Sequence, residues 1–167
     1  NQLKVLKLST SKLIANNAMK LSLLISDNLN LDTTDTPLLL YATAELLFEQ
    51  KKYSDCLEQL QQLELNFPEH TLIDEVLLKK ADVFIEQEMY THALECLNQI
   101  CSEHHYDILY DDALFYQGQI YEKIIGDNMQ AKEAYKTILL KTPNSIFINE
   151  ARNKYKLLRE NNFFKLE

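Results

Sequence analysis

The sequence predicts an all-α protein built from helical repeats, and two observations carry that prediction. Glycine and proline together make up 5 of the 167 residues, whereas their combined share in average proteins is about 12%. Folds rich in β-sheet need more glycine than this, because most hairpins and bulges place it at positive φ. The second observation is an apolar pattern with the spacing i, i+4, i+7, typical of the buried face of a helix, which recurs every 37 residues.

The repeat is visible in both halves of each unit. The apolar pattern occurs as Leu40-Ala44-Leu47, Leu77-Ala81-Phe84 and Leu114-Gly118-Tyr121. The segment after it repeats as Tyr53, Cys56, Leu60 and Leu63, then as Tyr90, Ala93, Leu97 and Ile100, and then at an offset of 38 as Ala131, Tyr135 and Ile138. Pro68 and Pro143 close the first and third units. We therefore expect one extra residue in the third unit, in the turn Gly126-Asp127-Asn128.

Each unit reads as a helix, a short turn, a second helix and a linker. The predicted helices span 37–50, 54–66, 72–88, 91–104, 108–125, 128–141 and 145–160, with one more within 3–28.

Local start signals agree with these spans. Thr36 is suited to cap the first helix, because Pro37 then occupies its first position, where a missing N–H costs nothing. Further start signals are Thr71 with Asp74 as a capping box, Asp127 with Gln130, and Ser145 before an apolar run.

Charge and length exclude several classes of protein. The net charge is −8, and residues 37–140 hold 7 lysines against 19 acids, which gives −12. Such an acidic middle repels phosphate, so nucleic acid is a poor partner. No run of 18 apolar residues occurs, so we expect no membrane span. The chain begins at Asn1, from which we expect a fragment of a longer protein.

Cysteine usage gives a weaker indication. Cys96 and Cys101 lie five positions apart on one predicted helix, about 140° around its axis, so they cannot pair within it. We interpret them, with Cys56, as small buried hydrophobic residues, which favours a reducing compartment.

The repeat resembles the tetratricopeptide repeat over residues 37–143. A small residue stands midway along each first helix (Ala44, Ala81, Gly118), a larger one follows a turn later, and a proline closes the unit. Units of 37–38 residues are longer than the usual 34 of that family, and leucine replaces its tryptophan. The resemblance implies a right-handed α-solenoid with repeats at 37–73, 74–110 and 111–143, an N-terminal helical segment at 1–36, and a capping helix with a tail at 144–167.

A finer resemblance concerns the C-terminal part. Pro143-Asn144-Ser145 followed by Glu150-Ala151-Arg152 is similar to repeats of bacterial envelope proteins, including outer-membrane assembly lipoproteins and partners of the Tol–Pal system. The end of the chain is also similar to uncharacterised Bacteroidetes repeat proteins. These resemblances imply the periplasm, whereas the three cysteines leave the cytoplasm open.

The family resemblance also implies a concave groove lined by the first helices. Seven of its fifteen residues are acidic, which suits a peptide or partner protein that carries Lys or Arg between apolar anchors. We therefore expect a non-catalytic protein–protein interaction scaffold. A clamp for a chaperone tail is rejected, because Glu45 and Asp82 stand where it needs neutral amides. The groove residues are Leu38, Tyr41, Glu45, Phe48, Glu49, Glu75, Leu78, Asp82, Ile85, Glu86, Asp112, Phe115, Gln119, Glu122 and Lys123.

Two alternatives stay open. The first is a structural spacer or self-association module without a groove ligand, in which the basic run of the 145–160 helix docks on an acidic surface. That run consists of Arg152, Lys154, Lys156 and Arg159. The alternative interpretation of this basic run is a solvated outer face, which capping helices normally have.

The second alternative is a metal site at the end of the second unit, where zinc-ligand types gather. Its members are Cys101, His104, His105, Asp107, Asp111 and Asp112. We favour a plainer interpretation, because acids stabilise the start of the following helix. No catalytic motif such as Gly-x-Ser-x-Gly or His-Glu-x-x-His occurs, so we expect neither an enzyme nor a cofactor.

Overall fold

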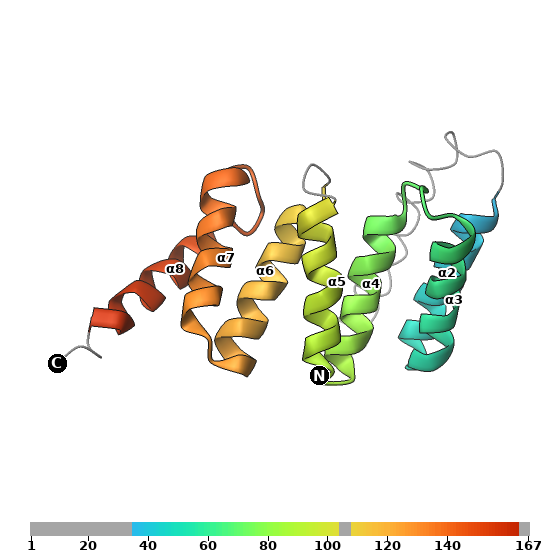
Figure 1. Cartoon of the computed structure of the whole chain (residues 1–167), viewed down its shortest axis with the longest axis horizontal. Coiled ribbons are helices and arrows are strands. Elements are labelled where there is room, and N and C mark those ends of the chain that lie inside the picture. Colours follow the sequence, from blue (N-terminus) through green and yellow to red (C-terminus); the bar gives the residue numbers. More distant parts are fainter. Residues whose placement is uncertain (1–34, 104–107, 164–167) are drawn as a thin grey trace, which may run out of the picture. The chain divides into compact units, whose positions relative to one another are not determined.

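The computed structural model describes residues 35–103 and 108–163, and within these ranges every regular element is helical (Figure 1). The elements are α2 (Thr36–Glu49), α3 (Tyr53–Asn66), α4 (Ile73–Glu86), α5 (Tyr90–Glu103), α6 (Tyr110–Ile120), the π-helical segment η1 (Tyr121–Ile125), α7 (Asn128–Lys141) and α8 (Ile148–Phe163). The chain divides into two compact units, Asn1–Thr71 and Leu72–Glu167. Successive helices pack against each other within each unit, so the predicted fold class, an all-α fold of consecutive helical repeats, is confirmed.

The first unit holds one helix pair, in which α2 packs along α3. Ala44 in α2 and the side chains of Cys56, Leu60 and Leu63 in α3 are completely buried. These are slots that the repeat assigned to the interior, and they follow the spacing of one helix face. The predicted N-terminal helix within 3–28 lies outside the described residues.

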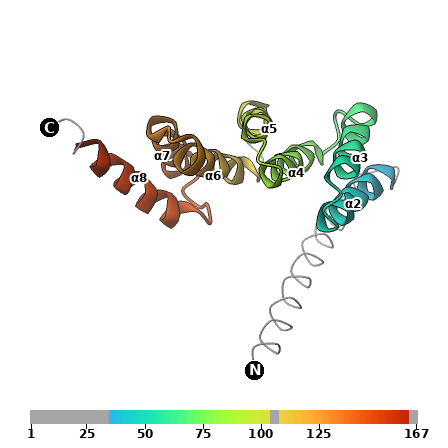
Figure 2. The same cartoon turned by 90° about the horizontal axis from the view of Figure 1, so that it is seen from below.

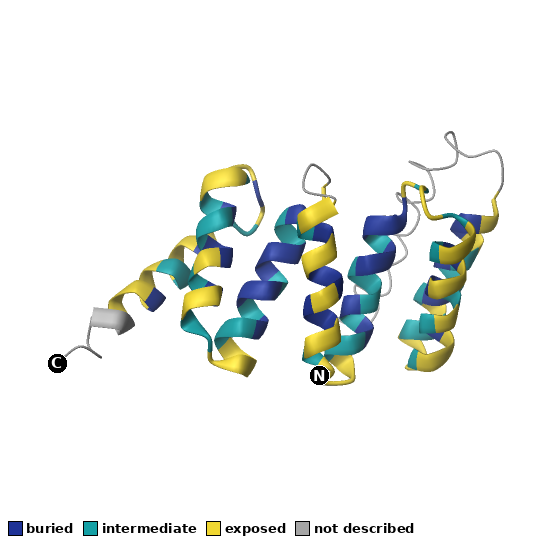
Figure 3. Ribbon diagram, in the orientation of Figure 1, coloured by how far each residue is buried: buried dark blue, intermediate teal, exposed yellow. Residues whose placement is uncertain are grey.

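The second unit continues the pattern through four α-helices and a cap. Here α4 packs on α5, α5 on α6, α6 on α7, and α7 on α8, as Figures 1 and 2 show. Figure 3 shows buried residues running along α4, α5 and α6, while most of α8 is exposed or half-buried. A helix that buries one stripe and leaves the rest polar is what the end of a stack requires.

The extra residue of the third repeat is not where the sequence analysis placed it. In each repeat one residue has positive φ, and each stands two positions before the next helix, namely Lys51, Glu88 and Gly126. The turn Gly126-Asp127-Asn128 therefore has the ordinary length. The additional residue is absorbed before the turn, where η1 widens the end of α6 into a π-helix.

Helix starts were predicted with mixed success. Asp127 caps α7 as expected, since its Oδ1 accepts hydrogen bonds from the backbone N–H groups of Met129 and Gln130 at 3.0 Å. The other start signals were wrong in detail. The N-caps of α2 and α4 are Asp35 and Leu72, neither of which makes a side-chain cap bond.

The last start is displaced along the chain. Ser145 Oγ accepts a hydrogen bond from the Phe147 N–H at 3.0 Å, and α8 begins at Ile148, three residues after the predicted position. Ser145 therefore stabilises the turn that leads into α8 and does not cap the helix.

Two helices end in the same hydrogen-bonded motif without the glycine that usually completes it. At the end of α2, Lys51 N–H donates to Phe48 O at 2.8 Å and Lys52 N–H donates to Leu47 O at 2.9 Å, which is the Schellman pattern. The same pattern ends α4, with Glu88 at the left-handed position. Lys51 has φ 58° and Glu88 has φ 59°, a region in which a Cβ is unfavourable.

Replacing Lys51 by glycine is therefore expected to stabilise the first unit by about 0.5–1 kcal/mol, because it removes the Cβ penalty at positive φ. Urea unfolding followed by circular dichroism measures the change. Glu58→Gly, at an exposed position inside α3, is the matched control and should cost about 1 kcal/mol. A loss of stability in Lys51→Gly would contradict the prediction.

Candidate functional site

The candidate site was predicted on the first helix of each repeat, and these helices are α2, α4 and α6 in the structure. In α2, Glu45 and Phe48 are half-buried and Glu49 is exposed, whereas Leu38 and Tyr41 are buried at 6% and 7% exposure. In the first unit, the accessible members of the predicted set therefore lie in the C-terminal half of α2.

In the second unit the predicted residues of α4 stay near the surface. Leu78, Asp82 and Ile85 are half-buried and Glu86 is exposed. The Asp82 carboxylate lies 3.4 Å from Lys79 Nζ, and its side chain keeps 29% of its exposure. This face of α4 is therefore a mixed surface of acids and aliphatic side chains with one lysine among them.

Acidic side chains of α4 and α6 converge on one tyrosine. Burial raises the pKa of the Tyr116 hydroxyl above its ordinary value, the negative charges of Asp82 and Asp112 raise it further, and Lys79 opposes them. A charge shifts a pKa in this way only when it lies near the titrating group. Asp82 and Asp112 come from different helices, so the second unit brings these two predicted site residues to a common surface around Tyr116.

Tyr116 itself is not among the site residues that the sequence analysis named. It follows Phe115 in α6, so it lies on a different side of the helix. Its position in the repeat could have identified it. Tyr116 lies one repeat of 37 residues after Lys79, and both side chains are half-buried.

Phe115 belongs to the core and not to the exposed surface. It is 4% exposed, its ring stacks on that of Phe147 with centroids 4.3 Å apart, and it packs against Tyr135. Phe147 comes from the turn before α8. In the third repeat this position therefore holds the turn before the capping helix α8 in place. A repeat pattern alone does not predict such a contact.

Glu122 also faces inward, where it links three segments. Its Oε2 accepts a hydrogen bond from Tyr135 Oη at 2.8 Å, and Lys154 Nζ donates to Oε1 at 3.0 Å and to Oε2 at 2.9 Å. The side chains of Glu122 and Lys154 are only 20% and 21% exposed. The carboxylate therefore joins η1, α7 and α8, which we call the Glu122 link.

The remaining site residues differ in exposure. Glu75, Asp112 and Gln119 are half-buried, and Lys123 is exposed.

Three members of the candidate metal cluster, His104, His105 and Asp107, lie outside the described residues. Cys101 is half-buried against the core of α6, α7 and α8, and Asp111 and Asp112 are in the first turn of α6, as the plainer interpretation required. Among the residues that the structure describes, no group of three or more His, Cys, Asp or Glu side chains suits a metal ion.

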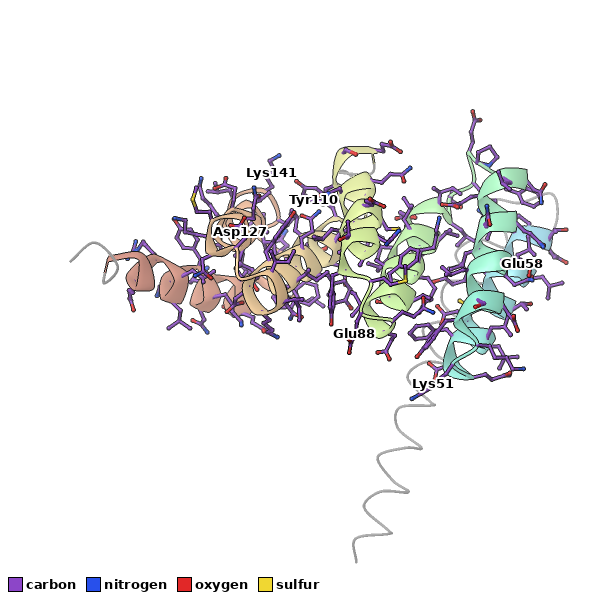
Figure 4. All side chains as sticks on the ribbon, turned by 60° about the horizontal axis from the view of Figure 1, so that its bottom comes forward. Lys51, Glu58, Glu88, Tyr110, Asp127 and Lys141 are labelled. Atoms are coloured by element: carbon purple, nitrogen blue, oxygen red, sulfur yellow. The ribbon has the colours of Figure 1, made fainter. Side chains whose placement is uncertain are left out.

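Cys101 is expected to react slowly with alkylating reagents. Burial raises the pKa of its thiol to about 11, although Gln117 and Lys141, labelled in Figure 4 near the end of α7, act in the opposite direction. Against the ordinary value of 9.0, this leaves about 100-fold less reactive thiolate at neutral pH. Iodoacetamide labelling followed by peptide mass spectrometry measures the rate, with the urea-unfolded chain as the reference. Equal rates in the two states would contradict the assignment.

The basic run of α8 is divided by the structure. Arg152, Lys156 and Arg159 are exposed, as a docking surface or a solvated face requires. Lys154 is engaged in the Glu122 link and so does not contribute to an outward-facing run. Within the described residues, no helix combines the length and apolar character needed to cross a bilayer.

Comparison with known proteins supports the repeat assignment in the third repeat. The family model of the tetratricopeptide repeat matches residues 112–145, which hold most of α6, then η1, α7 and the following turn. None of the curated proteins matches the chain significantly. Repeats of this family generally mediate protein–protein interactions, and their helical fold is typically a non-catalytic scaffold.

Proposed function

We propose that the α4–α6 face of the second unit binds a segment of a partner protein that carries Lys or Arg beside an apolar side chain. The face comprises Leu78, Asp82, Ile85, Glu86, Asp112, Tyr116 and Gln119. The observation that carries the proposal is that Asp82 and Asp112, which come from different helices, both raise the pKa of Tyr116. A cation placed over that ring would meet two carboxylates and an aromatic face, which are favourable partners for Arg.

In the first unit, α2 offers chemistry of the same kind through Glu45, Phe48 and Glu49. We include this face in the proposal as a binding surface of the same chemical kind, because acids again alternate with an apolar side chain. The function proposed is therefore that of a non-catalytic scaffold that recognises basic segments.

Binding of synthetic peptides, followed by fluorescence anisotropy, tests the proposal. An array of peptides that vary independently in Lys/Arg content and in apolar residues should show binding only when both are present. The variant Asp82→Lys/Glu86→Lys should lose this binding, because opposite charges become like charges. Glu45→Lys extends the test to α2.

The matched control is Glu95→Lys/Glu133→Lys, which makes the same change in net charge at exposed positions of α5 and α7. It should retain binding apart from a small general charge effect. Thermal melts of every variant separate lost recognition from unfolding. Equal binding by the wild type and the Asp82→Lys/Glu86→Lys variant would sink the proposal.

A second candidate function is self-association through α8, favoured by the exposure of Arg152, Lys156 and Arg159. These cations would dock on the acidic face of another copy, in which case the module acts as a spacer or assembly element. Such a complex must dissociate as salt is raised, because exposed charges are screened. Light scattering at low and high salt provides the measurement, and a monomer at both would refute this function.

We also infer, from the resemblance of residues 143–152 to repeats of envelope proteins, that the chain is one domain of a bacterial envelope protein. Fractionation of cells that express the full-length protein tests this inference. Recovery only in the cytosolic fraction would overturn it.

A further inference from the structure

An exposed apolar patch lies in the second unit where the α4–α5 turn meets η1. Met89, Ile124 and Ile125 keep 40%, 50% and 52% of their exposure. With Tyr90 and Glu88, which is labelled in Figure 4, they line an open pocket of about 440 Å³. Large apolar side chains gathered around a surface pocket mark an interaction site more often than a random surface does.

The three repeats show that the turn itself does not require these isoleucines. The dipeptide directly before the left-handed residue is Glu49-Gln50 in the first repeat, Glu86-Gln87 in the second and Ile124-Ile125 in the third. The same polar pair thus occupies this position twice. In the third repeat two half-exposed isoleucines replace it, within the π-helical segment η1, and π-helical turns are frequent at functional sites.

Charges of both signs flank the patch. Glu88 is exposed and lines the pocket from the α4–α5 turn, and Lys123 is exposed on η1, directly before Ile124 in the chain. A twofold axis through the patch would place Glu88 of one copy against Lys123 of the other, since a twofold interface sets one surface against itself. Because the middle of the chain carries a charge of −12 over residues 37–140, two copies can approach closely only where charge is locally balanced.

We propose that this patch is the contact surface of a symmetric dimer, with a second copy of the chain as its occupant. Ile124 and Ile125 pack against their counterparts and against Met89, and two Glu88–Lys123 pairs fix the orientation. The patch is small compared with the roughly 800 Å² per partner of stable complexes, so the dimer is weak and depends on concentration.

Sedimentation velocity over a wide range of protein concentration tests the proposal. The weight-average mass of the wild type should rise from 19.5 kDa toward twice that value. The variant Ile124→Glu/Ile125→Gln, which restores the pair found in the other two repeats, should stay monomeric. Leu140→Gln/Ile146→Gln is the control, because it removes side chains that are 71% and 84% exposed elsewhere in the unit, and it should dimerise like the wild type.

Charge exchange identifies the orientation. Glu88→Lys alone should weaken the dimer at least several-fold, and adding Lys123→Glu should restore it. A wild type that is monomeric at every concentration overturns the proposal. So does a dimer that persists in Ile124→Glu/Ile125→Gln, or one that the charge exchange fails to restore.

Discussion

Replacing Gly118 by alanine is expected to lower the free energy of unfolding by about 1–2 kcal/mol. A Cβ built at Gly118 would meet Tyr135 Cε1 at 2.5 Å and Cζ at 2.8 Å, well inside van der Waals contact. Tyr135 is completely buried and its hydroxyl is held by Glu122, so the ring has little room to move. Overpacking of this kind costs about 1–3 kcal/mol or more, against which the better helix propensity of alanine returns about 1 kcal/mol.

The sign of this effect should reverse when Tyr135 is replaced by leucine. In the first and second repeats, Ala44 and Ala81 occupy the slot of Gly118, and Leu60 and Leu97 occupy the slot of Tyr135. The smaller residue at the first position, glycine in place of alanine, thus accompanies the larger residue at the second, tyrosine in place of leucine. In a Tyr135→Leu background, Gly118→Ala should therefore stabilise by up to about 1 kcal/mol, since only the propensity gain remains.

Urea unfolding of the four proteins of this double-mutant cycle measures the coupling between the two positions. Glu122→Gln combined with Gly118→Ala serves as a control, because it alters the hydrogen bond of Tyr135 without removing the ring. Destabilisation by Gly118→Ala that is the same with Tyr135 and with Tyr135→Leu would disprove this compensation in size.

The periodic part of the fold could be predicted from the sequence because periodicity reports directly on burial. Ala44, Ala81 and Tyr135 recur at fixed spacings and all are completely buried. Helix ends were predicted within a few residues, because several depend on backbone motifs without a distinctive side chain. Lys51 and Glu88 take left-handed conformations where glycine is expected, so no residue type marks those turns.

The candidate site was harder to predict, because the same slot serves different purposes in different repeats. The slot of Leu78, which is half-buried in α4, holds Phe115 in α6, where it is buried under Phe147. The slot of Ile85 holds Glu122, which is bonded to Tyr135 and Lys154. Both departures arise from the segment that follows α7, through Phe147 in the turn and Lys154 in α8. Contacts between distant segments of this kind leave no periodic signal.

Replacing Glu122 by alanine is expected to destabilise the second unit by about 2–3 kcal/mol. The substitution leaves the Tyr135 hydroxyl and the Lys154 ammonium without their shared acceptor, although Lys154 keeps about a fifth of its exposure. Loss of one partner from a fully buried pair costs about 3–5 kcal/mol, and the remaining access to water reduces that figure. Lys154→Met and Tyr135→Phe should each cost less, about 1–2 kcal/mol, because each leaves the carboxylate one other donor.

A matched pair and a pH series separate this effect from a general effect of charge. Glu133→Ala breaks the Lys136–Glu133 contact, whose side chains are 42% and 60% exposed, and should cost less than about 0.5 kcal/mol. Burial and Glu122 raise the pKa of Tyr135 above its ordinary 10.0. The unfolded chain therefore loses this proton first, and stability that is present below pH 10 is lost as the pH rises further. Urea unfolding at several pH values should show Tyr135→Phe losing less stability above pH 10 than the wild type. Equal costs for Glu122→Ala and Glu133→Ala would contradict a structural role for the Glu122 link.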